Sequence, residues 1–221
     1  GLFSLAGRAA LARGDAGGAE PLLRAALAQR ERAHGARDAR LAHDLAYLNG
    51  ALLALGHDAE AVENGRRTVD LLEAAYGPRH RLTILHTNNL GALLRRAGDM
   101  GGAEAAFARA LEHAEATVGA GAPYVATVNS NLADVKAARG DLAGARAHLE
   151  RALAIDEAAY GPRHNSVARD LHKLARLLAR LGEREAARPL FARALAHFEA
   201  ARGADDAHTR ALRAEIAALD G

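Results

Sequence analysis

The sequence has no cysteine and no tryptophan, and only 4% of its 221 residues are aromatic. Without cysteine the chain has no disulfides and no thiolate chemistry, which agrees with a reducing cytosol, so we expect a cytoplasmic protein. No apolar run is long enough to cross a bilayer, and no signal-peptide pattern is visible. The formal net charge of +2 gives little electrostatic reason to expect nucleic acid. We therefore expect neither a membrane nor a nucleic acid among its partners.

Glycine, by contrast, is frequent, and much of it is strictly spaced. Two interleaved series each recur every 42 residues and miss no step over five repeats. A fixed period in this range predicts a stacked repeat protein rather than one globular core. The first series is Gly14, Gly56, Gly98, Gly140 and Gly182, and the second is Gly35, Gly77, Gly119, Gly161 and Gly203.

Other residue types keep the same register. An alanine follows each glycine of the first series by five residues, and an apolar residue precedes each by eight, next to a column of small residues such as Gly91 and Ala133. A leucine or phenylalanine follows by nine in every repeat except one, where Gly65 occupies the position and leaves a gap. The peptide EAAYGPRH at 73–80 recurs unchanged at 157–164, two periods later.

Both segments between the glycines predict helices. Leu45, Leu48, Leu52 and Leu55 recur at helical spacing, and the strong helix formers alanine, leucine, arginine and glutamate dominate. Each repeat is therefore expected to be a pair of helices, A then B, of about 18 residues or roughly 27 Å each. The first complete pair is expected near 38–55 and 58–75, and an eleventh helix near 206–220 closes the stack.

The ends of these helices carry capping residues. The repeated glycines stand where a helix C-terminus needs a left-handed residue, and Pro123 falls at a first-turn position. Side chains that cap helix N-termini follow the glycines: Asp15, Asp99 and Asp141 after the first series, and Asp38, His80, His164 and Asp206 after the second.

These signals predict one array over residues 1–221. Its repeats span about 1–35, 36–77, 78–119, 120–161 and 162–203, followed by the cap helix at about 206–220. The sequence starts inside a helical pattern and has no initiator methionine, which we interpret as an excised or processed segment of a longer protein.

The columns resemble the tetratricopeptide repeat, in its 42-residue kinesin-light-chain-like form. The residues that carry the resemblance are Asn89-Leu90-Gly91, Asn131-Leu132-Ala133, Arg109-Ala110-Leu111, Arg151-Ala152-Leu153 and the Gly-Pro-Arg-His before an A helix. The resemblance implies an all-α, right-handed superhelical solenoid of antiparallel helix pairs, with five pairs and a C-terminal capping helix. It also implies a concave groove, lined by A helices, that binds peptides.

The predicted function is a non-catalytic module that binds a partner protein or peptide in this groove. Arg169 and Lys173 share a helix face, with Asn131 on the matching stripe one repeat earlier, which resembles part of a carboxylate clamp. Asn88 and Ala92, one repeat before, leave that clamp incomplete. Two cations beside amides suit an acidic peptide or a free C-terminal carboxylate, although they also fit an ordinary solvated helix face. The residues expected to contact the peptide are Asn88, Asn89, Arg95, Arg96, Asn131, Arg169, His172, Lys173 and Arg176.

Other functions find less support. The eleven histidines include no His-Glu-x-x-His motif, and no phosphate loop or nucleophile elbow occurs, so we expect no metal, no cofactor and no catalytic residues. The alternative is a self-association or regulatory module of a larger bacterial signalling protein, linked for example to a kinase, nucleotidase or protease. Leu2, Phe3 and Leu5 favour it, because no preceding repeat covers them and a second copy could. The bias toward arginine, alanine and glycine indicates a bacterial gene.

Overall fold

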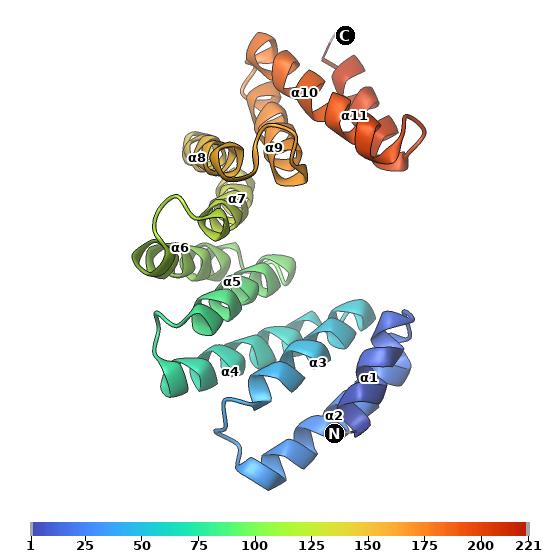
Figure 1. Cartoon of the computed structure of the whole chain (residues 1–221), viewed down its shortest axis with the longest axis vertical. Coiled ribbons are helices and arrows are strands. Elements are labelled where there is room, and N and C mark those ends of the chain that lie inside the picture. Colours follow the sequence, from blue (N-terminus) through green and yellow to red (C-terminus); the bar gives the residue numbers. More distant parts are fainter. Residues whose placement is uncertain (1, 220–221) are drawn as a thin grey trace. The chain divides into compact units, whose positions relative to one another are not determined.

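The computed structural model describes residues 2–219, and all regular structure in that range is helical (Figure 1). This confirms the predicted all-α class. The last residue of the predicted cap helix, Asp220, lies outside the described residues. The helices are α1 (Leu2–Ala12), α2 (Ala16–His34), α3 (Leu41–Leu55), α4 (Asp58–Tyr76), α5 (Arg81–Arg96), α6 (Met100–Val118), α7 (Pro123–Ala138), α8 (Leu142–Tyr160), α9 (Asn165–Arg180), α10 (Arg184–Arg202) and α11 (Ala207–Ala217).

The chain forms two compact units, one up to Thr117 and one from Val118 onward. In the first unit α1 packs on α2 and α3 on α4, and the pairs stack through α2 on α3 and α4 on α5. In the second unit α7 packs on α8 and α9 on α10, with α8 on α9 and α11 on α10. Odd-numbered helices are therefore the predicted A helices and even-numbered ones the B helices. Over residues 2–219, none of these helices has the length and apolar character needed to cross a membrane.

The periodic glycines take backbone conformations that other residues avoid. Gly56 ends α3 at φ 80° and ψ 15°, the left-handed conformation expected at a helix C-terminus. Gly77 ends α4 at φ 82° and ψ 167°, a region that is essentially reserved for glycine. A Cβ would meet no atom within 4 Å at either position, so backbone conformation and not space requires glycine. All ten periodic glycines have a positive φ, as predicted, but Gly77 combines it with an extended ψ instead of the left-handed helical one.

Most of the predicted N-terminal caps form. Asp15, Asp99 and Asp141 each accept the backbone N–H three residues later at 2.8 Å. His80, His164 and Asp206 accept the N–H two residues later, and Pro123 is the first residue of α7. The prediction for Asp38 was wrong: α3 starts only at Leu41, and the Asp38 carboxylate instead holds the backbone and side chain of Arg40.

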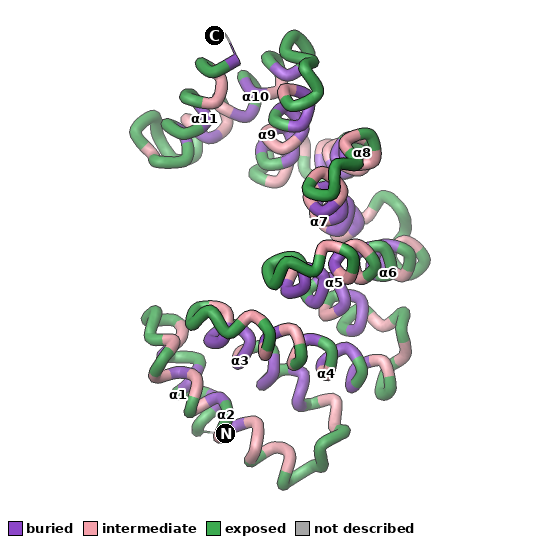
Figure 2. The backbone as a smooth tube through the Cα atoms, turned by 180° about the vertical axis from the view of Figure 1, so that it is seen from behind, coloured by how far each residue is buried: buried purple, intermediate pink, exposed green. Residues whose placement is uncertain are grey.

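Large residues of B helices pack against small residues of A helices. A Cβ on Gly7 would lie 2.7 Å from Leu23, and one on Gly91 would lie 2.7 Å from the ring of Phe107, which is fully buried. Because protein interiors are close-packed, a larger residue at the glycine position would clash with the large side chain that faces it. In Figure 2, the buried residues lie where packed helices face each other, and the exposed residues lie on the outer sides of the helices.

Candidate functional site

The predicted contact residues of the first unit all lie on α5. Asn88 is buried, whereas Asn89 and Arg95 are exposed. Arg96 pairs with Asp58 at 2.8 Å and donates to the carbonyl of Leu53 at 2.6 Å. Arg96 therefore joins the C-terminal end of α5 to the preceding helix pair. The sequence, which placed Arg96 on the exposed face of its helix, did not indicate this structural role.

A cavity of about 280 Å³ opens beside Asn89, between α3, α4 and α5. It lies at Gly65, where the sequence predicted a gap. Its walls are Ala46, Asn49, Gly50, Leu53, Gly65, Thr68, His86, Asn89, Leu90, Ala92 and Leu93.

In the second unit, Lys173 of α9 is held by α7. Its ammonium group lies 2.9 Å from Ser130 Oγ and 2.8 Å from Asp134 Oδ2. The lysine and aspartate side chains are both more than two-thirds buried. The partly buried pair is screened less by solvent than a surface ion pair, and it fixes the direction of the lysine.

Arg169 lies over two buried carboxylates. Its guanidinium is 3.5 Å from Asp170 Oδ1 and 3.9 Å from Asp156 Oδ2. Burial raises the pKa of Asp170 to about 6; Arg169 opposes this rise and the neighbouring Asp156 adds to it. Burial also raises the pKa of Asp156. One arginine therefore compensates two carboxylates that both resist ionisation.

The other two predicted residues share one acidic partner on α11. His172 Nε2 lies 2.9 Å from Glu215 Oε2, and Arg176 Nε lies 3.6 Å from the same oxygen. The His172 ring also packs near the rings of Phe191 and His208. The structure thus places Arg169, His172, Lys173 and Arg176 on α9, each beside a carboxylate of another helix or of α9 itself, while Asn131 lies on α7.

Sequence reasoning missed the buried aspartates, although a signal was present. A serine and an aspartate stand 40 residues apart twice, at Ser4 and Asp44 and again at Ser130 and Asp170. In both places the serine hydroxyl donates to the aspartate at 3.1 Å, and both aspartates are fully buried.

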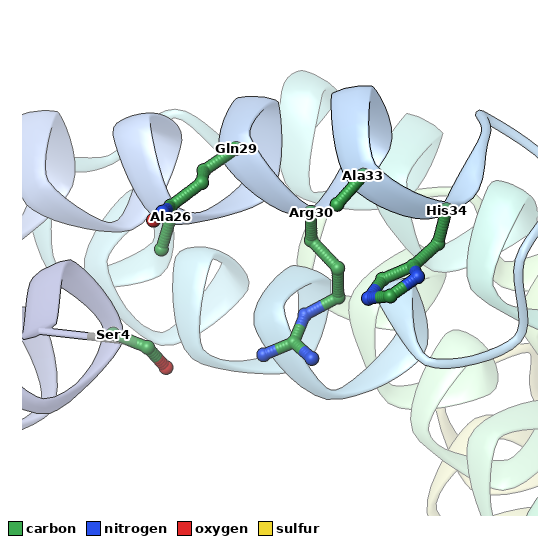
Figure 3. A pocket seen from close by; sticks show the side chains of 6 residues that line it. All are labelled: Ser4, Ala26, Gln29, Arg30, Ala33 and His34. Carbon is green, nitrogen blue, oxygen red and sulfur yellow. The ribbon is translucent and has the colours of Figure 1, made fainter.

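The first of these networks borders a cavity of about 170 Å³ (Figure 3). Ser4 reaches it from α1, while Arg30 and His34 extend toward it from α2. Arg30 Nε donates to Asp44 Oδ2. Here the buried carboxylate has a direct cationic partner.

The comparisons agree with this architecture. The family model described as tetratricopeptide repeat matches residues 47–116 and 124–216, which is most of the chain. The chain belongs to the tetratricopeptide repeat family. No curated protein matches the sequence.

Solved structures of tetratricopeptide repeat proteins share the fold at low identity. A Podosopora anserina protein described as a kinesin light chain with nearly identical TPR-like repeats is 20% identical, with a TM-score of 0.80, 91% of this chain and 95% of that one covered. BtubC from P. vanneervenii is 22% identical, with a TM-score of 0.78 and coverage of 91% and 80%. A Rap protein solved with Competence and Sporulation Factor is 17% identical, with a TM-score of 0.70 and coverage of 96% and 56%. The predicted resemblance to kinesin-light-chain-like tetratricopeptide repeats is confirmed.

Within residues 2–219 of this tetratricopeptide repeat chain, no three histidine or acidic side chains are placed to hold a metal ion. The A-helix faces carry oriented cations, carboxylates and amides, and the cavity beside Asn89 opens among them. Such groups suit recognition of a polypeptide by charge and hydrogen bonding.

Proposed function

We propose that the chain is a non-catalytic, cytoplasmic interaction module that binds a segment of a partner protein along its A-helix faces. The observation that carries the proposal is the set of cations on α9. Arg169 and Arg176 expose about half and two-thirds of their side chains, yet carboxylates behind or beside them limit their rotamers. A cation that is already oriented loses less entropy when it meets a ligand than a free one does.

The proposed contacts are those predicted from the sequence, in one array of five repeats and a cap. A peptide carboxylate would meet Arg169 and Arg176 directly, whereas at Lys173 it would compete with Asp134. Asn89 in the first unit and Asn131 in the second would each pair with a peptide backbone, because an amide both donates and accepts, whereas the predicted contact Asn88 is buried. The favoured partner is therefore an acidic segment or a free C-terminal carboxylate. The Rap protein solved with a bound factor supports a ligand-binding use of this fold by analogy.

A pull-down tests this proposal. The variant Arg169→Glu, Arg176→Glu reverses two exposed cations of α9, and Arg184→Glu, Arg188→Glu makes the same charge change on the B helix α10. We expect partners to be lost only with the α9 variant, and a captured segment to bind at least about tenfold more weakly when its carboxylates are amidated. Circular dichroism verifies that both variants fold. Identical partners for all three proteins would overturn the proposal.

Self-association is a second candidate, favoured by one observation. On α1, Leu2 is 85% exposed, Leu5 64% and Phe3 47%. Such neighbouring exposed apolar side chains are typical of an interface. Sedimentation should then show mass that rises with concentration and falls in Leu2→Ser, Leu5→Ser. A constant monomer mass in the wild type rejects this candidate.

A further inference from the structure

In the repeat formed by α3 and α4, the small residue lies on the B helix and the larger one on the A helix, the reverse of the other repeats. In other repeats a small residue of the A helix faces a large one of the B helix, as Gly91 faces Phe107. Here the A-helix position carries Asn49 and the B-helix position carries Gly65. Leu93 and Leu90 of the next helix move into the space, since a Cβ on Gly65 would lie 2.6 and 3.2 Å from them. They do not fill it, and the cavity of about 280 Å³ remains.

The cavity has an open mouth and a buried floor. Ala46, Gly50 and Asn89 are exposed at the mouth, on the A-helix face, and Asn49, Gly65 and Thr68 form the floor. A cavity of about 150 Å³ already holds benzene. This cavity therefore has room for one aromatic ring with a substituent.

One polar atom of the floor is left without a partner. Asn49 is 8% exposed, and its Oδ1 is buried with no hydrogen bond. An unpaired buried acceptor is costly, and such a group in a native structure calls for an explanation. The neighbouring Thr68 hydroxyl is already used, because it donates to the carbonyl of Asn64 at 2.7 Å.

The chemistry of the walls selects a neutral ligand with a hydroxyl group. Burial lowers the pKa of His86, so its imidazole is neutral at neutral pH and offers no charge to an anion. Leu53, Leu90 and Leu93 provide apolar contact for a ring. A phenol both donates and accepts, so it satisfies the Asn49 amide in either of its two orientations, which an indole N–H does not.

We propose that this cavity receives a tyrosine side chain of the bound partner, with the ring between the leucines and the hydroxyl on Asn49. This inference rests on the proposed peptide-binding function. The tyrosine anchors the segment in the first unit, independently of the charged residues of α9.

A fragment titration tests the cavity without any partner. The full chain, labelled with ¹⁵N, is titrated with p-cresol and with toluene, which has the same ring without the hydroxyl. We expect p-cresol to shift the signals of Asn49, Gly50 and Gly65, and to bind about three- to tenfold more tightly than toluene. Asn49→Leu removes the acceptor at similar size and should abolish this preference. Ala46→Leu should occlude the mouth and abolish binding, whereas Ala138→Leu, an exposed alanine on α7, should not.

Two outcomes overturn the inference: no p-cresol shift at these residues, or equal affinity for p-cresol and toluene in the wild type. A captured partner segment that binds equally well after tyrosine-to-phenylalanine replacement overturns it too, while the proposed function stands. If instead no partner is captured, the peptide-binding function fails, and the fragment result still decides whether the cavity recognises a phenol.

Discussion

The two units contain the same buried hydrogen bond in opposite electrostatic surroundings. Ser4 donates to Asp44 in the first unit, and Ser130 donates to Asp170 in the second, both at 3.1 Å and three repeats apart in sequence. In the first unit the B helix supplies Arg30 to the carboxylate. The position three repeats later is Asp156, a second carboxylate.

The second unit also has a cation near its buried aspartate, but a different helix supplies it. Arg169 in the second unit stands where the first unit has His43, on the A helix instead of the B helix. Arg30 is about three-quarters buried and bonds Asp44 directly, whereas Arg169 is half exposed and 3.5 Å from Asp170. The repeat thus keeps its backbone and one hydrogen bond while charges around them are free to rearrange. The arrangement in the second unit turns a cation toward solvent, where a ligand can reach it.

The largest effect should come from removing the direct cation of the first unit. Arg30→Met leaves Asp44 buried without its partner and should lower the free energy of unfolding by about 3–4 kcal/mol. Urea unfolding measures the loss, and hydrogen exchange of α3 amides localises it to the first unit. The double variant Arg30→Met, Asp44→Asn is the control, because it removes both charges and should recover most of the loss. A single variant as stable as the wild type would show that Asp44 needs no cation.

The second unit should respond to pH with the opposite sign from ordinary surface carboxylates. The folded pKa of Asp170, about 6, lies above the unfolded value of about 3.9, so the folded unit binds more protons between these values. Its stability should therefore rise as pH falls from about 6 to about 4, by up to about 3 kcal/mol.

Asp170→Asn is the control for this pH profile. It removes the titrating group and keeps the size of the side chain, so the difference between wild type and variant isolates Asp170 from the other carboxylates. Hydrogen exchange of α9 amides at several pH values follows the second unit alone. A difference that does not change between pH 4 and pH 7 would contradict the prediction.

A smaller change should follow from relieving the pair of carboxylates. Asp156→Asn removes the like charge beside Asp170 but also the attraction to Arg169 at 3.9 Å. Because Asp156 is buried and its pKa is raised, we expect a net gain of about 1 kcal/mol at pH 7 and a lower pKa for Asp170. Carboxyl ¹³C shifts report that pKa directly. A higher Asp170 pKa in the variant would mean that Asp156 assists its ionisation.

Much of the fold follows from the sequence because its causes are local. The glycine period, the N-terminal caps and the small-to-large columns each depend on a few neighbouring residues, and nearly all of them are present as expected. The cap predicted at Asp38 was wrong because α3 starts three residues later, at Leu41, and the Asp38 carboxylate binds Arg40 instead.

The residues of α9 were correctly placed on one face, but their pairing depends on Asp134, Asp156 and Glu215, which come from other helices. The cavity followed from Gly65, whereas the unpaired Asn49 oxygen required the structure.

The smallest expected effect concerns another pair of positions at which the two units carry different side chains. In the first unit the guanidinium of Arg8 lies 4.7 Å over the ring of Tyr47, and three repeats later the same positions are Asp134 and Lys173. The double variant Asp134→Arg, Lys173→Tyr gives the second unit the pair of the first. A cation–π contact and a partly exposed ion pair are each worth about 1 kcal/mol or less, so unfolding should change by less than about 1 kcal/mol.

Lys173→Tyr alone leaves Asp134 without its cation and should be less stable than the double variant, most clearly in urea at low salt, where the ion pair is least screened. Equal stability of the single and double variants would show that the two surroundings are not interchangeable. The double variant also separates folding from recognition. If the second unit binds an acidic segment at this pair, the variant should stay folded and bind at least as tightly, because it exchanges a neutral ion pair for one cation and removes the carboxylate that competes at Lys173.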